Sequence, residues 1–215
     1  MSNPFDAIAA LGVVPVIAID RADDAVALAD ALIEGGLPVA EITFRTPAAA
    51  AVMERISAER PQLLVGAGTV LDLDSLEAAR RSGARFGLAP GFDAEIVAAA
   101  GRHGFPFAPG VMTPSEVSAA AARGIGTMKF FPAGAAGGPK ALDAIAAPFR
   151  HLGLRFIPTG GVNLQTAKDF IKAGAAALGV GADLVDLQAL RRGEAETITE
   201  RARKFLSLVA EARAE

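Results

Sequence analysis

The sequence predicts an α/β fold, a single (β/α)8 barrel with a short N-terminal helix, and three observations support this prediction. Eight short β-rich segments recur along the 215 residues. Helical stretches separate them, so that the strands start about 20 to 27 residues apart, which is the length of one strand, one helix and two short loops. The strand segments are apolar on both faces, as in parallel sheets that helices cover.

The N-terminal segment "MSNPFDAIAALG" predicts a short capped helix, with Asn3 as N-cap, Pro4 at the first helical position and Gly12 as the stop. This segment does not resemble a signal peptide. The eight strands that follow are predicted at Val13–Ile19, Val39–Phe44, Leu63–Val70, Phe86–Gly91, Phe105–Val111, Thr127–Pro132, Leu154–Gly161 and Ala176–Gly181.

The stretches between the strands predict amphipathic helices. Two of them, "DDAVALADALIEGG" and "DLDSLEAARRSGA", open on acidic or hydroxyl residues and close near glycine. No Pro/Ser-rich linker interrupts the series, so we expect one domain over residues 1–215. The Gly- and Pro-rich strand endings would meet at the C-terminal rim, where barrel enzymes build their active sites. A doubly wound open sheet is the alternative architecture.

The composition narrows the function to small soluble ligands. The chain has 52% hydrophobic residues, and 21 Lys and Arg are dispersed among 24 Asp and Glu, for a net charge of −3. No basic face therefore indicates nucleic acid or an anionic membrane. The absence of cysteine excludes disulfides, thiolate metal sites and a thiol nucleophile, and it fits a reducing cytoplasm. Two histidines are too few for a conventional metal cage, so we expect no metal.

The alternation of side chains along two strands brings a buried acid towards a buried amine. In "VAEITFR" the side chains of Glu41, Thr43 and Arg45 share one face, and in "TMKFFP" Lys129 and Phe131 do the same. If these faces line the barrel, Glu41 and Lys129 converge at middle depth. Arg45 then lies roughly 13 Å further along its strand, at the rim.

Two interpretations of this pair are open. A structural ion pair is one, although a buried pair gains little net stability over well-packed apolar residues. The other is a Schiff-base lysine, in which desolvation lowers the pKa of Lys129 and frees its lone pair to attack a ketone. Apolar surroundings would raise the pKa of Glu41, which suits that residue to shuttle protons. We favour the second interpretation because the two residues occur together.

Four further residues are expected around the pair. Arg45 is either a solvated arginine or a fork for a carboxylate. Thr69 follows two glycines in "GAGTV", where its hydroxyl could bind the same carboxylate, although turn chemistry alone also accounts for it. Pro90 in "LAPGF" is a turn proline and a wall of the pocket, and Phe131 is expected to form another wall.

Glycine-rich turns after the last two strands predict a phosphate site. In "PTGGVN", residues 158–163, two glycines precede the helix cap Asn163 and expose backbone N–H groups at a helix N-terminus. The sequence "GVGA" supplies a second such turn. The expected phosphate-binding residues are Thr159, Gly160, Gly161, Gly181 and Ala182.

Taken together, these motifs resemble one family, the class I 2-keto-3-deoxy-6-phosphogluconate (KDPG) aldolases, which are also active as 4-hydroxy-2-oxoglutarate (KHG) aldolases. The likeness runs from about Gly12 to Val185. The motifs that carry it are, in order, "GVVPVIAI", "EITFRTP", "VGAGTV", "APGF", "PGVMTPSEV", "KFFPAG", "PTGGVN" and "GVGADLV".

The resemblance implies retro-aldol cleavage of the phosphorylated sugar acid to pyruvate and glyceraldehyde 3-phosphate, without a metal or an organic cofactor. The lysine of "KFFP", Lys129, would form an imine with the C2 ketone, and the glutamate of "EITFR", Glu41, would act as acid and base. Arg45 and Thr69 would hold the pyruvate carboxylate. Members of the family are typically homotrimers, so the resemblance also implies that assembly.

One departure bears on the substrate. Phosphate would lie against Gly160 and Gly161 and near Gly181 and Ala182, and many relatives carry a serine where this chain has Ala182. A lost neutral hydrogen bond is worth about 0.5–1.5 kcal/mol, so phosphate affinity is expected to fall several-fold. Non-phosphorylated 4-hydroxy-2-oxo acids and the galactonate epimer therefore remain as substrates. A phosphosugar isomerase or epimerase and a non-catalytic binding barrel are the alternatives from other classes.

Overall fold

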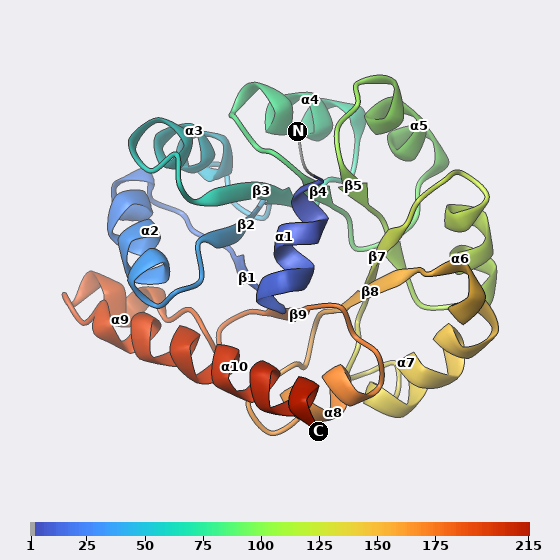
Figure 1. Ribbon diagram of the computed structural model, residues 1–215. Helices are drawn as coiled ribbons and strands as arrows, with labels where there is room; N and C mark the ends of the chain where they lie inside the picture. The colour runs from blue at the N-terminus through green and yellow to red at the C-terminus, as the bar shows by residue number, and fades with distance from the viewer. Residues whose placement is uncertain (1–2) are drawn as a thin grey trace.

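The computed structural model describes residues 3–215, in which parallel strands form a curled central sheet inside a ring of helices (Figure 1). Six strands pair in the order β5-β4-β3-β2-β1-β9, and three more pair in the order β6-β7-β8. The strand order is sequential and β1 pairs with β9, so the order lacks the reversal of a doubly wound open sheet. The first four strands are β1 (Val13–Ile17), β2 (Val39–Thr43), β3 (Leu64–Gly68) and β4 (Gly87–Leu88). The others are β5 (Phe107–Ala108), β6 (Gly110–Val111), β7 (Thr127–Phe130), β8 (Arg155–Pro158) and β9 (Leu178–Val180).

Every predicted strand segment contains a strand, and the parallel α/β architecture is confirmed. The strands are assigned to two sheets, however, and not to the single eight-stranded cylinder that we predicted. The fifth segment is divided into β5 and β6 by Pro109, which has no N–H to donate, although its carbonyl accepts from the Lys129 N–H at 2.9 Å. One isolated bridge, between Thr159 and Gly179, joins the chain beyond β8 to β9.

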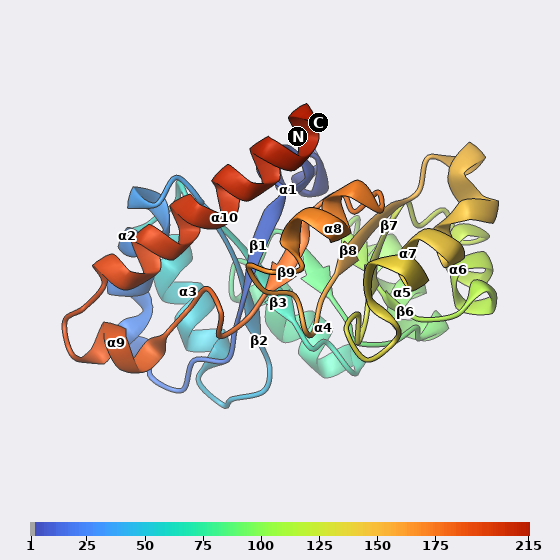
Figure 2. The ribbon, with the colours of Figure 1, turned by 90° about the horizontal axis from the view of Figure 1, so that it is seen from below.

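The N-terminal helix α1 (Pro4–Leu11) lies across one end of the ring of strands (Figures 1 and 2). Its caps are as predicted: the Asn3 side chain accepts from the Phe5 N–H at 3.0 Å, and Gly12 ends the helix with a φ of 75°. The Phe5 ring packs edge-on against Phe86, with 5.8 Å between the ring centroids. Because α1 covers this end, the interior opens towards the opposite end.

The remaining helices form the outer layer (Figure 1). They bury apolar faces against the strands. In α2 (Ala25–Glu34), for example, Leu28 and Leu32 are fully buried. Within residues 3–215 no helix combines the length and hydropathy that a bilayer crossing needs. The helices are α2 (Ala25–Glu34), α3 (Ala49–Glu59), α4 (Leu73–Arg81), α5 (Ala94–Arg102), α6 (Pro114–Ala121), α7 (Gly138–Ala146), α8 (Ala167–Lys172), α9 (Leu187–Arg191) and α10 (Glu196–Ala214), with 3₁₀ turns at Ala22–Asp24 and Ala147–Leu152.

Candidate active site

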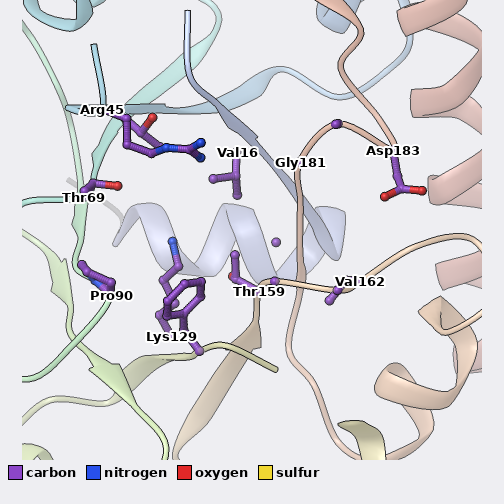
Figure 3. Close-up of a pocket in the computed structure, with 15 residues that line it drawn as sticks. Val16, Arg45, Thr69, Pro90, Lys129, Thr159, Val162, Gly181 and Asp183 are labelled. Carbon is purple, nitrogen blue, oxygen red and sulfur yellow. The ribbon is translucent and has the colours of Figure 1, made fainter. Parts of the chain in front are cut away.

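A cavity of about 380 Å³ lies at the carboxyl ends of the strands, on the side away from α1 (Figure 3). Its walls come from segments that are far apart in the sequence, because the ends of parallel strands meet at one rim. Every predicted site residue except Glu41 lines it, namely Arg45, Thr69, Pro90, Lys129, Phe131, Thr159, Gly160, Gly161, Gly181 and Ala182.

Lys129 on β7 lies at the floor of this cavity, and Glu41 on β2 lies directly behind it, as the alternation of side chains predicts. The Lys129 Nζ atom is 2.8 Å from Glu41 Oε1. The lysine side chain is 5% exposed, and the glutamate side chain is completely buried. The amine points into the cavity (Figure 3) and lies 5.8 Å from the centroid of the Phe131 ring. One side of the amine therefore faces the open cavity, and the other faces its carboxylate partner.

The carboxylate of Glu41 is held in a space that a glycine provides. A Cβ atom at Gly68, on the neighbouring strand β3, would overlap Glu41 Oε1. The second oxygen, Oε2, is buried and has no hydrogen-bond partner among residues 3–215. A buried oxygen without a partner lowers the stability of the fold. It can readily accept a proton, or a hydrogen bond from a hydroxyl group.

The rim above the pair carries one cation and one hydroxyl. The guanidinium of Arg45 extends across the cavity towards Val16 and Gly181, and the Thr69 hydroxyl points into the cavity from the loop after β3 (Figure 3). Thr69 has a φ of 57°, the one positive φ of a non-glycine residue in the described part of the chain. A β-branched residue adopts this conformation only under strain, and such strain collects at functional sites.

Two glycine-containing loops form the opposite wall. Gly160 and Gly161, after β8, have φ values of 86° and 82°, which a side chain would make unfavourable. The backbone N–H groups of four residues on this wall take part in none of the hydrogen bonds found within residues 3–215: Gly161, Val162, Ala182 and Asp183. Free N–H groups on two adjacent loops suit an anion such as phosphate.

Sequence reasoning missed five lining residues, which are Val16, Thr43, Val162, Gly179 and Asp183. The alternation of side chains placed Thr43 on the face of Glu41 and Arg45, but we did not predict it as a site residue; its hydroxyl donates to the Ile17 carbonyl at 3.0 Å. Asp183 is different, because nothing local distinguishes it from a solvated aspartate. Among residues 3–215 no three His, Cys, Asp or Glu side chains gather into a group that could hold a metal ion.

The site therefore offers a buried amine beside an acid, with anion-binding groups on both sides of it. This arrangement suits a keto acid whose ketone carbon lies over Lys129 while its carboxylate and a second anionic group occupy the two walls. A buried amine with a nearby acid can form and hydrolyse an imine.

Comparison with known proteins agrees with this geometry. The family model described as KDPG and KHG aldolase matches residues 6–201. The 2-dehydro-3-deoxy-phosphogluconate aldolase of Treponema pallidum is 36% identical over 209 residues, which cover 97% of this chain and 99% of that protein.

Two solved structures are also similar. The KDPG aldolase of Legionella pneumophila, with pyruvate captured at low pH as a covalent carbinolamine intermediate, superposes with a TM-score of 0.88 at 36% identity and covers 94% of this chain and 97% of that one. The 2-keto-3-deoxy-6-phosphogluconate aldolase of Zymomonas mobilis with 3-phosphoglycerate has a TM-score of 0.84 at 32% identity and covers 97% of both chains.

Proposed function

Because the chain belongs to the KDPG and KHG aldolase family, we propose that Lys129 forms the imine of its reaction and that Glu41 is the acid and base. The protein is an aldolase, a carbon–carbon lyase that works through a Schiff base and cleaves 2-keto-3-deoxy-6-phosphogluconate to pyruvate and glyceraldehyde 3-phosphate. The observation that carries the residue assignment is the 2.8 Å contact between Lys129 Nζ and Glu41 Oε1 at the cavity floor.

The first half of the reaction makes the imine. Lys129 Nζ first gives a proton to Glu41, and its freed lone pair adds to the C2 ketone carbon. The carbonyl π bond breaks, and the oxygen takes the proton from Glu41 to give a carbinolamine. Glu41 removes a proton from the nitrogen and returns one to the C2 hydroxyl, which leaves as water. The protonated imine that remains is an electron sink.

The second half breaks the carbon–carbon bond. Glu41, acting through a water molecule, removes the proton of the C4 hydroxyl, the C3–C4 bond breaks, and its electron pair moves into the imine to give an enamine. Glyceraldehyde 3-phosphate is the first product. A proton returns to C3, and water then hydrolyses the imine to release pyruvate and restore Lys129. The buried Glu41 Oε2, which has no partner within residues 3–215, supports this proton-carrying role.

The two walls of the cavity would bind the ends of the substrate. Arg45 and Thr69 would hold the carboxylate, because a guanidinium and a hydroxyl both donate hydrogen bonds to it. Pro90 and Phe131 would form the apolar walls. The phosphate would lie against the loops at Thr159, Gly160 and Gly161 and at Gly181 and Ala182, and the relative with bound 3-phosphoglycerate supports a phosphate end.

Ala182 favours a second group of substrates for the same chemistry. Its side chain has no hydroxyl, so on that side the loop binds phosphate through backbone alone. Non-phosphorylated 4-hydroxy-2-oxoglutarate, whose aldolase activity belongs to the matched family description, is therefore the second candidate, and the galactonate epimer is the third. An isomerase or epimerase has no need of the Lys129–Glu41 pair.

We also propose that the two sheets are parts of one closed (β/α)8 barrel in a single domain over residues 1–215, of which residues 1 and 2 lie outside the described part. The support is that only Pro109 separates β5 from β6 and that the bridge from Thr159 to Gly179 joins β8 to β9. The homotrimer and the cytoplasmic location stay predictions from the sequence. Analytical ultracentrifugation tests the trimer.

Reduction of the imine tests the proposed function. Pyruvate and borohydride should convert the protein to a stable adduct, and peptide mass spectrometry should locate that adduct on Lys129. Lys129→Met should abolish it, whereas Lys140→Met, which removes an exposed lysine on α7, should leave it intact. An adduct on another lysine, or one that persists in Lys129→Met, would refute the assignment.

A further inference from the structure

Arg201 of α10 lies behind the loop that follows β9. Its Nη1 atom donates to the Ala182 carbonyl at 3.2 Å, and its Nη2 atom is 3.9 Å from Asp186 Oδ2. With Ala182 it borders two hollows outside the active-site cavity, one of about 490 Å³ that also reaches Arg45 and one of about 400 Å³ that also reaches Asp183. One side of the loop thus faces α10, and the other lines the cavity (Figure 3).

The bond from Arg201 fixes the direction of one peptide group. The Ala182 carbonyl and the Asp183 N–H belong to the same planar trans peptide, so they point in opposite directions. Because the carbonyl is held towards α10, the N–H is turned towards the cavity side. A charged donor on the carbonyl also polarises the peptide and strengthens its N–H as a donor. The Gly181 carbonyl, which accepts from Leu184 and Val185 at 3.0 Å each, anchors the start of the same turn.

The charge of Arg201 also matters at this position. The loop carries two carboxylates, Asp183 at the cavity and Asp186 as the N-cap of α9. Hydrogen bonds from the Ala189 and Gln188 N–H groups, with a smaller contribution from the charge of Arg201, lower the pKa of Asp186, so it is ionised at neutral pH. Two negative charges beside a phosphate dianion oppose its binding, and a guanidinium behind the loop offsets them.

We propose that Arg201 is a positioning residue for the phosphate end of the site: it turns the Asp183 N–H towards the substrate phosphate and offsets the negative charge of the loop. By this route it sets the preference for phosphorylated over non-phosphorylated keto acids. The inference rests on the proposed aldolase function. It assigns Arg201 no contact with the reacting atoms.

Steady-state kinetics of Arg201→Met and Arg201→Lys on two substrates test the proposal. Arg201→Met should raise KM for 2-keto-3-deoxy-6-phosphogluconate about five- to tenfold while kcat stays within about twofold, as expected for the loss of one charge-assisted interaction outside the reacting atoms. KM for 4-hydroxy-2-oxoglutarate should not change. The inhibition constant of inorganic phosphate should rise in parallel, and Arg201→Lys should recover most of the loss.

The matched control is Arg203→Met. Arg203 is an exposed arginine of the same helix, and it pairs with Glu196 and Glu34 instead of the loop. This variant should leave both KM values unchanged. Equal changes of KM for both substrates in Arg201→Met would overturn the proposal, because a merely structural role of Arg201 predicts them. An unchanged inhibition constant for phosphate would also overturn it, because that result is expected if Arg201 has no role in phosphate binding. Adduct formation with pyruvate and borohydride keeps the two hypotheses separate, since a missing adduct in the wild-type protein refutes the aldolase assignment and not the role of Arg201.

Discussion

The Glu41 carboxylate can occupy the interior only because position 68 has no side chain. Gly66 and Gly68 lie on the same face of β3, and a Cβ atom at either would overlap a neighbour, the Phe86 ring at one position and Glu41 Oε1 at the other. The two glycines therefore make room for different things. Gly66 accommodates the packing of the core, and Gly68 accommodates a proposed catalytic group.

This difference makes Gly68→Ala and Gly66→Ala a matched pair of variants. Gly68→Ala should displace Glu41 and lower kcat about 100-fold, because a general acid and base must lie within hydrogen-bond reach of the group that it serves. Gly66→Ala should mainly lower the free energy of unfolding, by about 1–3 kcal/mol through overpacking. Urea unfolding and steady-state kinetics of both variants measure these effects. Equal loss of kcat in both would contradict the separate roles.

Thr69 combines a strained backbone with a hydroxyl at the site. A left-handed conformation costs a residue with a side chain roughly 1–2 kcal/mol. Thr69→Gly should therefore stabilise the protein by up to about 1 kcal/mol, once the greater freedom of glycine in the unfolded chain is included. Because it removes the hydroxyl proposed to bind the carboxylate, it should also raise KM for the keto acid substrates. Thr69→Asn, which tolerates the same φ and keeps a polar group, should recover part of the affinity. A Thr69→Gly protein that is less stable than the wild type would contradict the strain argument.

At the scale of single elements, local patterns predicted the strands, the first helix and the shared face of Glu41 and Arg45. These features depend on alternation and on capping residues, which neighbours along the chain determine. The space for Glu41 could not be predicted in this way, because it depends on the register that sets Thr43 opposite Gly68 across β2 and β3. The φ of Thr69 likewise follows from the tertiary structure, whereas the break at Pro109 could have been predicted, because a proline within a strand has no N–H to donate.

Ion pairs join α8 to α10 and to the residue that follows it, and they make the stability of the protein depend on pH. Lys168 Nζ lies 2.5 Å from Glu211 Oε2, and Lys172 pairs with Glu215. The hydrogen bond from Lys168 lowers the pKa of Glu211 below its ordinary value of 4.5, and the same bond raises the pKa of Lys168 above 10.5. The stabilisation by this pair is therefore complete between these two ordinary values. It is lost as Glu211 is protonated in acid and as Lys168 is deprotonated in base.

Lys168→Met should accordingly flatten the acid limb of the stability profile. In the wild-type protein the free energy of unfolding should fall as the pH drops from about 4.5 to about 3, partly because Glu211 takes up a proton more readily in the unfolded chain. Without Lys168 that part of the fall should shrink, and the Ser207 hydroxyl, which also donates to Glu211 and lowers its pKa, accounts for what remains. Urea unfolding across this range measures it, with Lys140→Met as a control, since Lys140 makes no ion pair within residues 3–215. Identical profiles for Lys168→Met and the wild type would show that the exposed pair contributes nothing measurable.

For the molecule as a whole, the proposed catalytic pair is a burden on stability. Helix α1 covers one end of the interior (Figure 2), so Lys129 meets solvent only through the cavity, Glu41 meets none, and one carboxylate oxygen has no partner in the described chain. Desolvating two charges can cost more than their attraction returns. A fold that kept this pair for stability alone would do as well with two apolar side chains, which is why the pair itself can be used to separate function from structure.

A double-mutant cycle makes that separation. Lys129→Met or Glu41→Leu alone should destabilise the protein by about 3–5 kcal/mol, because each leaves the other group buried without its partner. The double variant should be as stable as the wild type or more stable, and it should have no aldolase activity. Urea unfolding of the four proteins gives the coupling energy. If the double variant were instead destabilised about as much as each single variant, the ion pair itself would stabilise the fold, and the structural ion pair would be the better interpretation.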